Sequence, residues 1–246
     1  MEKILICVVH LEPLPGSPNY KNFDEVFNNA LMDAKAAENG GADAIIIENF
    51  GDVPYQKEVG KEVVACMAVV AKEIRRETSI GLGINVLRND ALAALAIAKA
   101  VKADFIRVNQ LYFGSLTPEG WIEGKAAEVL RYRKQIDCNA MIFADLNVKH
   151  AVHIASFEDY LMNVERALPD AVIATGATTG REVRISDLKM MRKLDIPVLA
   201  GSGVDAENIG RILEHCDGVI VGTYIKKKGR IDEERVRRLA NSIKKR

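Results

Sequence analysis

Short apolar runs alternate along the chain with longer amphipathic stretches. The apolar runs are residues 4–9, 44–47, 80–84, 105–108, 140–144, 171–174, 197–200 and 218–221. Their first residues are on average about 31 positions apart, which is the size of a βα unit. Because several runs lack polar–apolar alternation, they are typical of parallel strands that are covered on both faces.

The stretches between the runs have helical periodicity. One of them places five apolar residues on a single helical face: Val63, Met67, Val70, Ala71 and Ile74. Ser156 followed by Asp159 predicts a capped helix start, and Thr117 followed by Pro118 predicts another. The chain therefore reads as eight strands, each followed by a helix.

Eight βα units in 246 residues predict an α/β protein with one domain over residues 1–246, a closed (β/α)8 TIM barrel. The alternative is an open doubly wound sheet, which usually carries G-x-G-x-x-G after its first strand. Here the first run is followed by His-Leu-Glu-Pro-Leu-Pro-Gly-Ser-Pro at residues 10–18, which does not match that motif. The pattern favours the barrel.

The amino-acid composition excludes several classes of protein. The chain is 48% hydrophobic and 28% charged, with 34 basic and 34 acidic residues, so it is not disordered. The zero net charge gives no indication of a nucleic-acid partner. No apolar run reaches the roughly 18 residues of a membrane-spanning helix, so we do not expect the chain to be an integral membrane protein. Four scattered cysteines without C-x-x-C predict buried, reduced thiols and a cytoplasmic location.

Polar residues gather where the predicted strands end. In a (β/α)8 barrel the site lies at these carboxyl ends, so we expect their side chains to converge on one rim. The residues expected to bind substrate are His10, Asn85, Arg107, Asn109, Thr175 and Thr178. For Arg107 an ion pair with Glu48 or Asp145 that fills the barrel top is an equal and compatible alternative.

Three residues are candidates for catalysis. Asp145 follows a buried run and is the first candidate for a general base, and Glu48 is the second. The alternative for each is a hydrogen-bond acceptor that fixes a loop. Lys149 is a third candidate, through Schiff-base chemistry, although it lies in a loop past its strand.

Glycines after the last two predicted strands predict a phosphate site. Gly201, Ser202 and Gly203 follow one strand, and Gly222 and Thr223 follow the next. Backbone N–H groups in such turns close around an anion, and the start of a following short helix adds its dipole. The alternative is that the glycines only make tight turns. The lysines at 226–228 are interpreted as a mostly solvated run.

A divalent metal is possible but not required by the spacing. His10, Glu48, Asp145 and His150 would make a site if they converged, although they come from different strands. A flavin is a further alternative, because flavin barrels use the same type of phosphate site, and we consider it less favoured.

Two long loops are candidate lids. Residues 10–22 are rich in proline, and residues 109–124 carry Tyr112, Phe113 and Trp121. The aromatic loop could cover a ligand or contact another subunit. A homo-oligomer is the expectation for a barrel of this size.

Several motifs together resemble a known family. They are HLEPLPGSP at 10–18, ENFGDVPY at 48–55, RVN at 107–109, ADLNVKH at 144–150 and TGATTG at 175–180. They look like the BtpA/SgcQ family over essentially the whole chain. The resemblance implies a ribulose-phosphate-binding type of barrel. The family is named for a role in photosystem I biogenesis, other members lie among sugar-uptake genes, and some are labelled nucleoside triphosphatases. It implies no particular reaction.

Three functions follow from these patterns. The first is an enzyme, an isomerase, lyase or hydrolase, that acts on a small phosphorylated metabolite such as a sugar or nucleoside phosphate. The second is a non-enzymatic assembly or stability factor that works through protein partners. The third is a flavin-dependent oxidoreductase.

Overall fold

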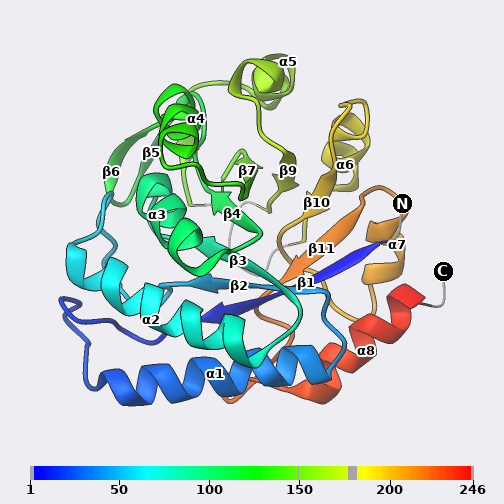
Figure 1. Cartoon of the computed structure of the whole chain (residues 1–246). Helices are drawn as coiled ribbons and strands as arrows, with labels where there is room; N and C mark the ends of the chain where they lie inside the picture. The colour runs from blue at the N-terminus through cyan, green and yellow to red at the C-terminus, as the bar shows by residue number, and fades with distance from the viewer. Residues whose placement is uncertain (1–2, 149, 177–181, 245–246) are drawn as a thin grey trace.

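Eight parallel strands close into a barrel in the computed structural model, which describes residues 3–148, 150–176 and 182–244 (Figure 1). The barrel strands are β1 (Ile4–His10), β2 (Ala44–Glu48), β3 (Gly81–Asn85), β4 (Phe105–Val108), β7 (Met141–Leu146), β9 (Ala171–Ala174), β10 (Val198–Ala200) and β11 (Gly218–Val221). Their order around the barrel is β1-β11-β10-β9-β7-β4-β3-β2. Each predicted apolar run overlaps one of these strands, so the predicted (β/α)8 barrel is confirmed.

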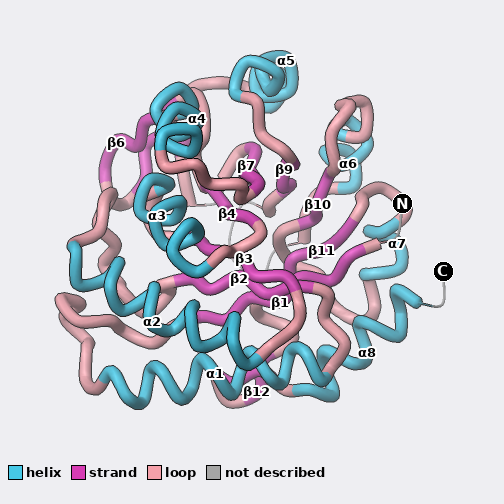
Figure 2. Tube along the Cα trace, viewed as in Figure 1, coloured by secondary structure: helices cyan, strands magenta, loops and turns pink. Residues whose placement is uncertain are grey.

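Helices surround the strands on all sides in Figures 1 and 2. They are α1 (Phe23–Asn39), α2 (Lys61–Glu77), α3 (Ala91–Val101), α4 (Ala126–Gln135), α5 (Phe157–Ala167), α6 (Ile185–Met191), α7 (Ile209–Leu213) and α8 (Glu233–Lys244). The buried residues of α2 are the five predicted from the periodicity. Ser156 and Asp159 form the predicted capping box at the start of α5.

Apolar side chains fill the inside of the barrel. Phe105 and Phe143 stack there with their ring centroids 4.5 Å apart. The other buried residues of this inner cluster are Ile6, Val8, Ala44, Ile46, Ala171, Ile173, Leu199 and Ile220. At Gly83 a Cβ atom would lie 2.3 Å from the Phe105 ring, so that ring occupies the space a larger residue would need. The barrel is therefore packed solid below its rim.

Two small antiparallel sheets were not predicted. One contains β5 (Gly114–Thr117), β6 (Gly120–Glu123) and β8 (Val152–His153), and the other is the hairpin of β12 (Lys226–Lys227) and β13 (Arg230–Ile231). The helix start predicted at Thr117 is wrong, because Thr117 ends β5 and its hydroxyl donates to the Gly120 carbonyl at 3.0 Å. Gly120 adopts φ +94°, which permits the tight turn into β6.

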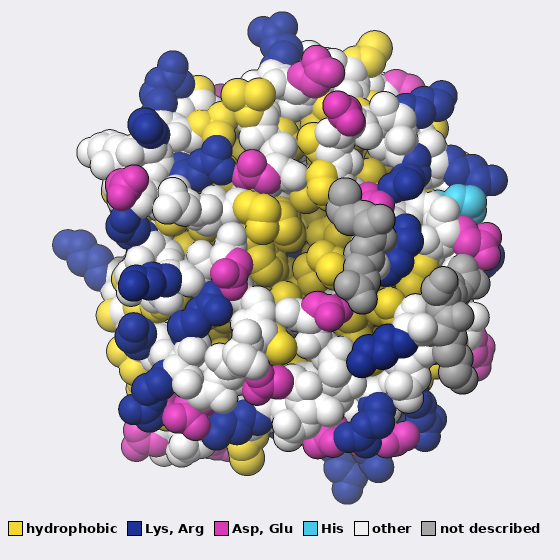
Figure 3. Space-filling view, turned by 45° about the vertical axis from the view of Figure 1, so that its right-hand side comes forward, with side chains coloured by type: hydrophobic (Ala, Val, Ile, Leu, Met, Phe, Trp, Pro, Cys, Tyr) yellow, Lys and Arg dark blue, Asp and Glu magenta, His cyan; other side chains and the backbone are white. Residues whose placement is uncertain are grey.

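Charges of both signs are intermixed on the face shown in Figure 3, around a central area of hydrophobic side chains. This arrangement agrees with the zero net charge of the chain. Within the described ranges, no helix is both long and apolar enough to cross a membrane. Cys7, Cys138 and Cys216 are buried as predicted, whereas Cys66 is half-buried.

Candidate functional site at the rim of the barrel

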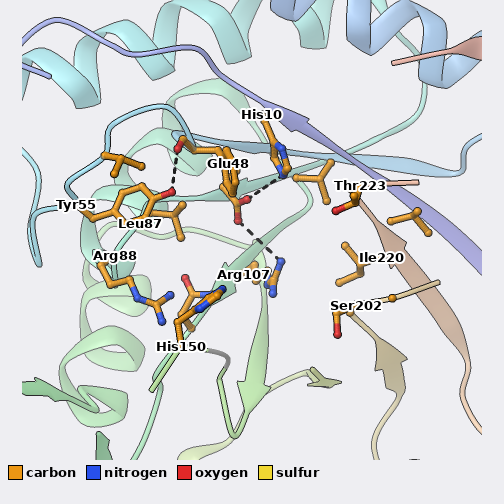
Figure 4. Close-up of a pocket in the computed structure, with 18 of the residues that line it drawn as sticks. His10, Glu48, Tyr55, Leu87, Arg88, Arg107, His150, Ser202, Ile220 and Thr223 are labelled. Carbon is orange, nitrogen blue, oxygen red and sulfur yellow. Dashed lines mark hydrogen bonds and ion pairs between the residues drawn. The ribbon is translucent and has the colours of Figure 1, made fainter. Parts of the chain in front are cut away.

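A cavity of about 590 Å³ lies at the carboxyl ends of the strands, within the size range of pockets that hold small-molecule ligands. Figure 4 labels ten of the residues around it. The predicted site residues that line the cavity are His10, Glu48, Arg107, Asn109, His150, Gly201, Ser202, Gly203, Gly222 and Thr223. The structure thus brings most of the predicted strand-end residues together.

Strand alternation explains why these side chains point inward. Every second residue of a barrel strand faces the interior, so His10 follows Val8 into the barrel, and Glu48 follows Ile46. Backbone register places His10 beside Glu48, and Glu48 beside Asn85, on three neighbouring strands. The polar residues therefore form the top layer of the barrel interior, directly above its apolar core.

Glu48 is buried at the centre of this layer. The Asn85 amide donates to Glu48 Oε1 at 2.5 Å, and His10 Nε2 lies 3.4 Å from Oε2. Arg107 Nη1 is 3.9 Å from Oε1 (Figure 4). One carboxylate thus connects a potential proton carrier, His10, to a fixed positive charge.

Arg107 is a fully enclosed cation, with 3% of its side chain exposed. Its Nε and Nη2 donate to the two carboxylate oxygens of Asp145 at 3.2 and 3.0 Å. Burial by itself would lower the pKa of Arg107, but the charges of Asp145 and Glu48 outweigh burial and hold its pKa above the ordinary value. The guanidinium is therefore permanently charged within the cavity wall.

Asp145 lies beneath the cavity and has no exposed side-chain surface. Besides the two bonds from Arg107, it accepts one from the Asn109 amide at 2.7 Å. With both oxygens engaged, the carboxylate is placed to orient Arg107 and Asn109. Its role as general base stays a prediction. Glu48 lines the cavity and can be reached by a ligand, as a general base must be, whereas Asp145 does not line it.

The His10 ring is held between two loops. It stacks on Phe50, with centroids 4.1 Å apart and an interplanar angle of 10°. On its other side, a Cβ atom at Gly222 would lie 3.3 Å from His10 Nε2. The absence of a side chain at Gly222 therefore leaves room for the imidazole beside Glu48.

The glycine turns pack closely against their neighbours and contain backbone N–H groups without a protein acceptor. A Cβ at Gly201 would lie 2.4 Å from Ile173 Cγ2, and Gly203 adopts φ +64°. In the described part of the chain, the backbone N–H groups of Gly203, Thr223 and Tyr224 have no protein acceptor, and all three residues line the cavity. These groups are available to an anion.

The start of α7 does not contribute the helix dipole that we predicted. The N–H groups of Glu207 and Asn208, just before α7, both donate to Asp205 Oδ1 at 2.9 Å. The Asp205 carboxylate therefore already occupies the place of an anion there.

The remaining predicted residues have different positions. Asn85 does not line the cavity, but its amide donates a hydrogen bond to Glu48. The Thr175 hydroxyl donates to the Asn147 carbonyl at 3.2 Å. Lys149 and Thr178 lie outside the described residues.

The four residues considered as a possible metal site are not gathered into one. Among the residues whose positions are described, no three His, Cys, Asp or Glu side chains are grouped as metal ligands. Arg107 lies between Glu48 and Asp145, so its guanidinium already provides the positive charge that a cation would supply. The donor set of His10, Glu48, Asp145 and His150 is thus not assembled.

Several cavity residues were missed by the sequence analysis. Phe50 and Tyr55 come from the loop after β2, Arg88 from the loop after β3, and Glu119 from the turn between β5 and β6. The only signal for the first two was the motif at 48–55. Outside this set, burial lowers the pKa of the half-buried Lys226 to about 8, opposed by the charges of Asp33 and Glu48, whereas Lys227 and Lys228 are exposed as predicted.

Replacement of Arg107 should destabilise the protein strongly. Arg107→Met would leave the buried Asp145 carboxylate without its counter-charge, and we expect the free energy of unfolding to fall by about 3–5 kcal/mol. Arg211→Met breaks an exposed ion pair with Glu182 and should cost less than about 1 kcal/mol. Urea unfolding of both variants measures the difference, and equal costs would contradict the importance of the buried pair.

Comparisons with known proteins agree with the fold and give the family. The sequence model of the BtpA family matches residues 1–245. A protein from Archaeoglobus fulgidus is 65% identical over 99% of this chain and 100% of its own length. The photosystem I biogenesis protein BtpA of Synechocystis is 41% identical over 93% of this chain and 82% of its own.

Solved structures with a similar fold are distant in sequence. N-(5'-phosphoribosyl)anthranilate isomerase from Pyrococcus furiosus has a TM-score of 0.65 and 15% identity, with all of both chains covered. Thiamine phosphate pyrophosphorylase from the same organism has a TM-score of 0.62 and 16% identity, covering 99% of this chain and 96% of its own. At this identity the likeness shows the fold alone. The match over nearly the whole sequence, together with the 41% identical relative, shows that the chain belongs to the BtpA family.

Proposed function

We propose that the protein is an enzyme that carries out acid–base chemistry on a small phosphorylated metabolite. The observation that carries the proposal is the composition of one cavity. The turns after β10 and β11 offer backbone N–H groups to an anion, and the group of Glu48, His10 and Arg107 lines the same space. A phosphate held by the turns would place the rest of the ligand against this group.

The phosphate is assigned to the N–H groups of Gly203, Thr223 and Tyr224. In (β/α)8 barrels, phosphate sites frequently occupy the loops after the seventh and eighth strands, which here are β10 and β11. Two proteins of similar fold are named for phosphoribosyl and thiamine phosphate compounds, which supports the assignment by analogy.

Proton transfer is assigned to Glu48 together with His10. Arg107 balances the negative charge of Glu48 and of a bound intermediate. Asn109 Oδ1 is buried, and no group in the described ranges donates a hydrogen bond to it. Since Asn109 lines the cavity, this oxygen is placed to accept a bond from a ligand hydroxyl. Isomerisation, glycosyl cleavage and aldol chemistry all fit these groups.

Phosphorylated ligands should stabilise the protein. A ligand at one hundred times its Kd stabilises by about 2.7 kcal/mol, which raises the Tm by roughly 5–11 °C in a chain of this length. We expect such a shift with ribose 5-phosphate or ribulose 5-phosphate in a titration that also includes inorganic phosphate and flavin mononucleotide.

The same titration on two variants locates the phosphate. Thr223 is exposed, so Thr223→Glu should fold normally but place a carboxylate beside the turn and remove the shift. Thr223→Gln retains the N–H group and the neutral charge and should keep the shift. Absence of any shift in the wild type, or its survival in Thr223→Glu, would count against this phosphate site.

Glu48→Gln should separate binding from chemistry. For any sugar or nucleoside phosphate whose turnover is detected by NMR, we expect kcat to fall by about 10²–10⁴-fold with little change in Kd. Gln cannot accept the proton but fills the same space. If Asp145→Asn reduced kcat equally at unchanged Kd and Glu48→Gln did not, the base would be Asp145 instead.

Protein binding is a second candidate function, favoured by an exposed apolar row on the sheet of β5, β6 and β8. Leu116 pairs with Trp121 on one side and with Val152 on the other. These side chains are 54%, 44% and 68% exposed. Large apolar residues side by side on a surface mark contacts with other proteins. We assign this row to a second copy of the chain, because self-complementary dimers are the commonest oligomers.

Leu116→Asp tests this assignment. A charge in the centre of the row should convert a wild-type dimer to a monomer in light scattering after size exclusion, whereas Met32→Asp on the exposed face of α1 should not. A monomeric wild type would overturn self-association.

A further inference from the structure

The cavity has a second wall that the proposed chemistry does not use. In the ring of eight strands, β3 and β10 are four strands apart in either direction, so the loop after β3 faces the glycine turn after β10. Figure 4 shows Tyr55, Leu87 and Arg88 on one side of Glu48 and Arg107, with Ser202 and Thr223 on the other. A ligand fixed at the turns can therefore extend past the acid–base group to this wall.

The second wall is apolar. Its lining side chains are Phe50, Val53, Pro54, Tyr55, Leu87 and Pro118. Phe50 is 39% exposed and Val53 is 50% exposed, although both are large and apolar. Because these surfaces border a cavity, an apolar part of a ligand would cover them and be held by the hydrophobic effect. A simple sugar phosphate has no such part.

An ion pair forms the polar edge of this wall. Arg88 Nε lies 3.4 Å from Glu119 Oε2, and both side chains are mostly buried. In the described part of the chain, Glu119 Oε2 nevertheless accepts no hydrogen bond. A buried carboxylate oxygen in that position is placed to accept a bond from an N–H group of a ligand.

We propose that this wall is a subsite for a planar heterocycle with N–H donors on its edge, and that the substrate is a phosphorylated compound carrying such a ring. The ring would lie against Phe50 and Leu87 and donate to Glu119, while the phosphate occupies the turns after β10 and β11. This inference rests on the proposed function and names its substrate class. It predicts that the heterocycle, and not only the phosphate, contributes to affinity.

The test compares ribose 5-phosphate with adenosine 5'-monophosphate, in which an adenine ring replaces the anomeric hydroxyl, by isothermal titration calorimetry. We expect the wild type to bind the nucleotide about tenfold more tightly, as stacking and apolar contact of one base provide. Phe50→Ala and Glu119→Leu should each reduce this ratio toward one, by weakening the binding of the nucleotide more than that of ribose 5-phosphate. Met32→Ala, on the exposed face of α1, should retain the full ratio.

The outcomes distinguish the two proposals. Equal affinities in the wild type, or a ratio that survives both Phe50→Ala and Glu119→Leu, would overturn the ring subsite and leave the phosphate site intact. Binding of adenosine as tight as that of its monophosphate, lost in Phe50→Ala, would support the subsite and overturn the phosphate site. If neither adenosine nor any phosphorylated probe binds, both proposals fail.

Discussion

The buried charge of Arg107 determines how the barrel rim is built. A guanidinium enclosed by protein must be neutralised, and here Asp145 accepts two hydrogen bonds from Arg107 while Glu48 lies 3.9 Å away. Each partner then orders another side chain, because Asp145 binds the Asn109 amide and Glu48 binds the Asn85 amide. One cation therefore organises side chains from five of the eight strands, if His10 beside Glu48 is included.

The apolar core below this layer gives those charges their strength. Phe105 and Phe143 fill the barrel interior beneath Arg107, so water does not reach the ion pair from below. In such surroundings electrostatic interactions are much stronger than in water. A negative charge that develops on a ligand in the cavity would be stabilised by Arg107 without rearrangement, since Asp145 holds the guanidinium in place. Packing and site chemistry are thus two consequences of the same strand alternation.

The sequence predicted the strands and most of the rim because both follow a local pattern. Apolar runs mark the strands, and the inward phase continues from Ile46 to Glu48 without interruption. Which of the two carboxylates faces the cavity was not predictable from the sequence. It depends on how Arg107 pairs with Glu48 and with Asp145, which lie on strands far apart in the chain. The sheet of β5, β6 and β8 was not predicted because Thr117 followed by Pro118 has the sequence pattern of a helix start. Phe50 and Arg88 come from irregular loops, whose course no periodicity describes.

Neither the family nor the fold identifies the substrate, so the loops around the cavity are the parts of the structure that bear on it. The glycine turns after β10 and β11 belong to a place that many barrels use for phosphate, so they say little about the rest of the ligand. By contrast, the loops after β2 and β3 supply the apolar wall, and the turn between β5 and β6 supplies Glu119. That turn belongs to the same small sheet whose outer face carries Leu116 and Trp121. Contact of this sheet with another subunit, as proposed, would also fix Glu119 at the cavity and would link the exposed apolar row to the proposed ring subsite.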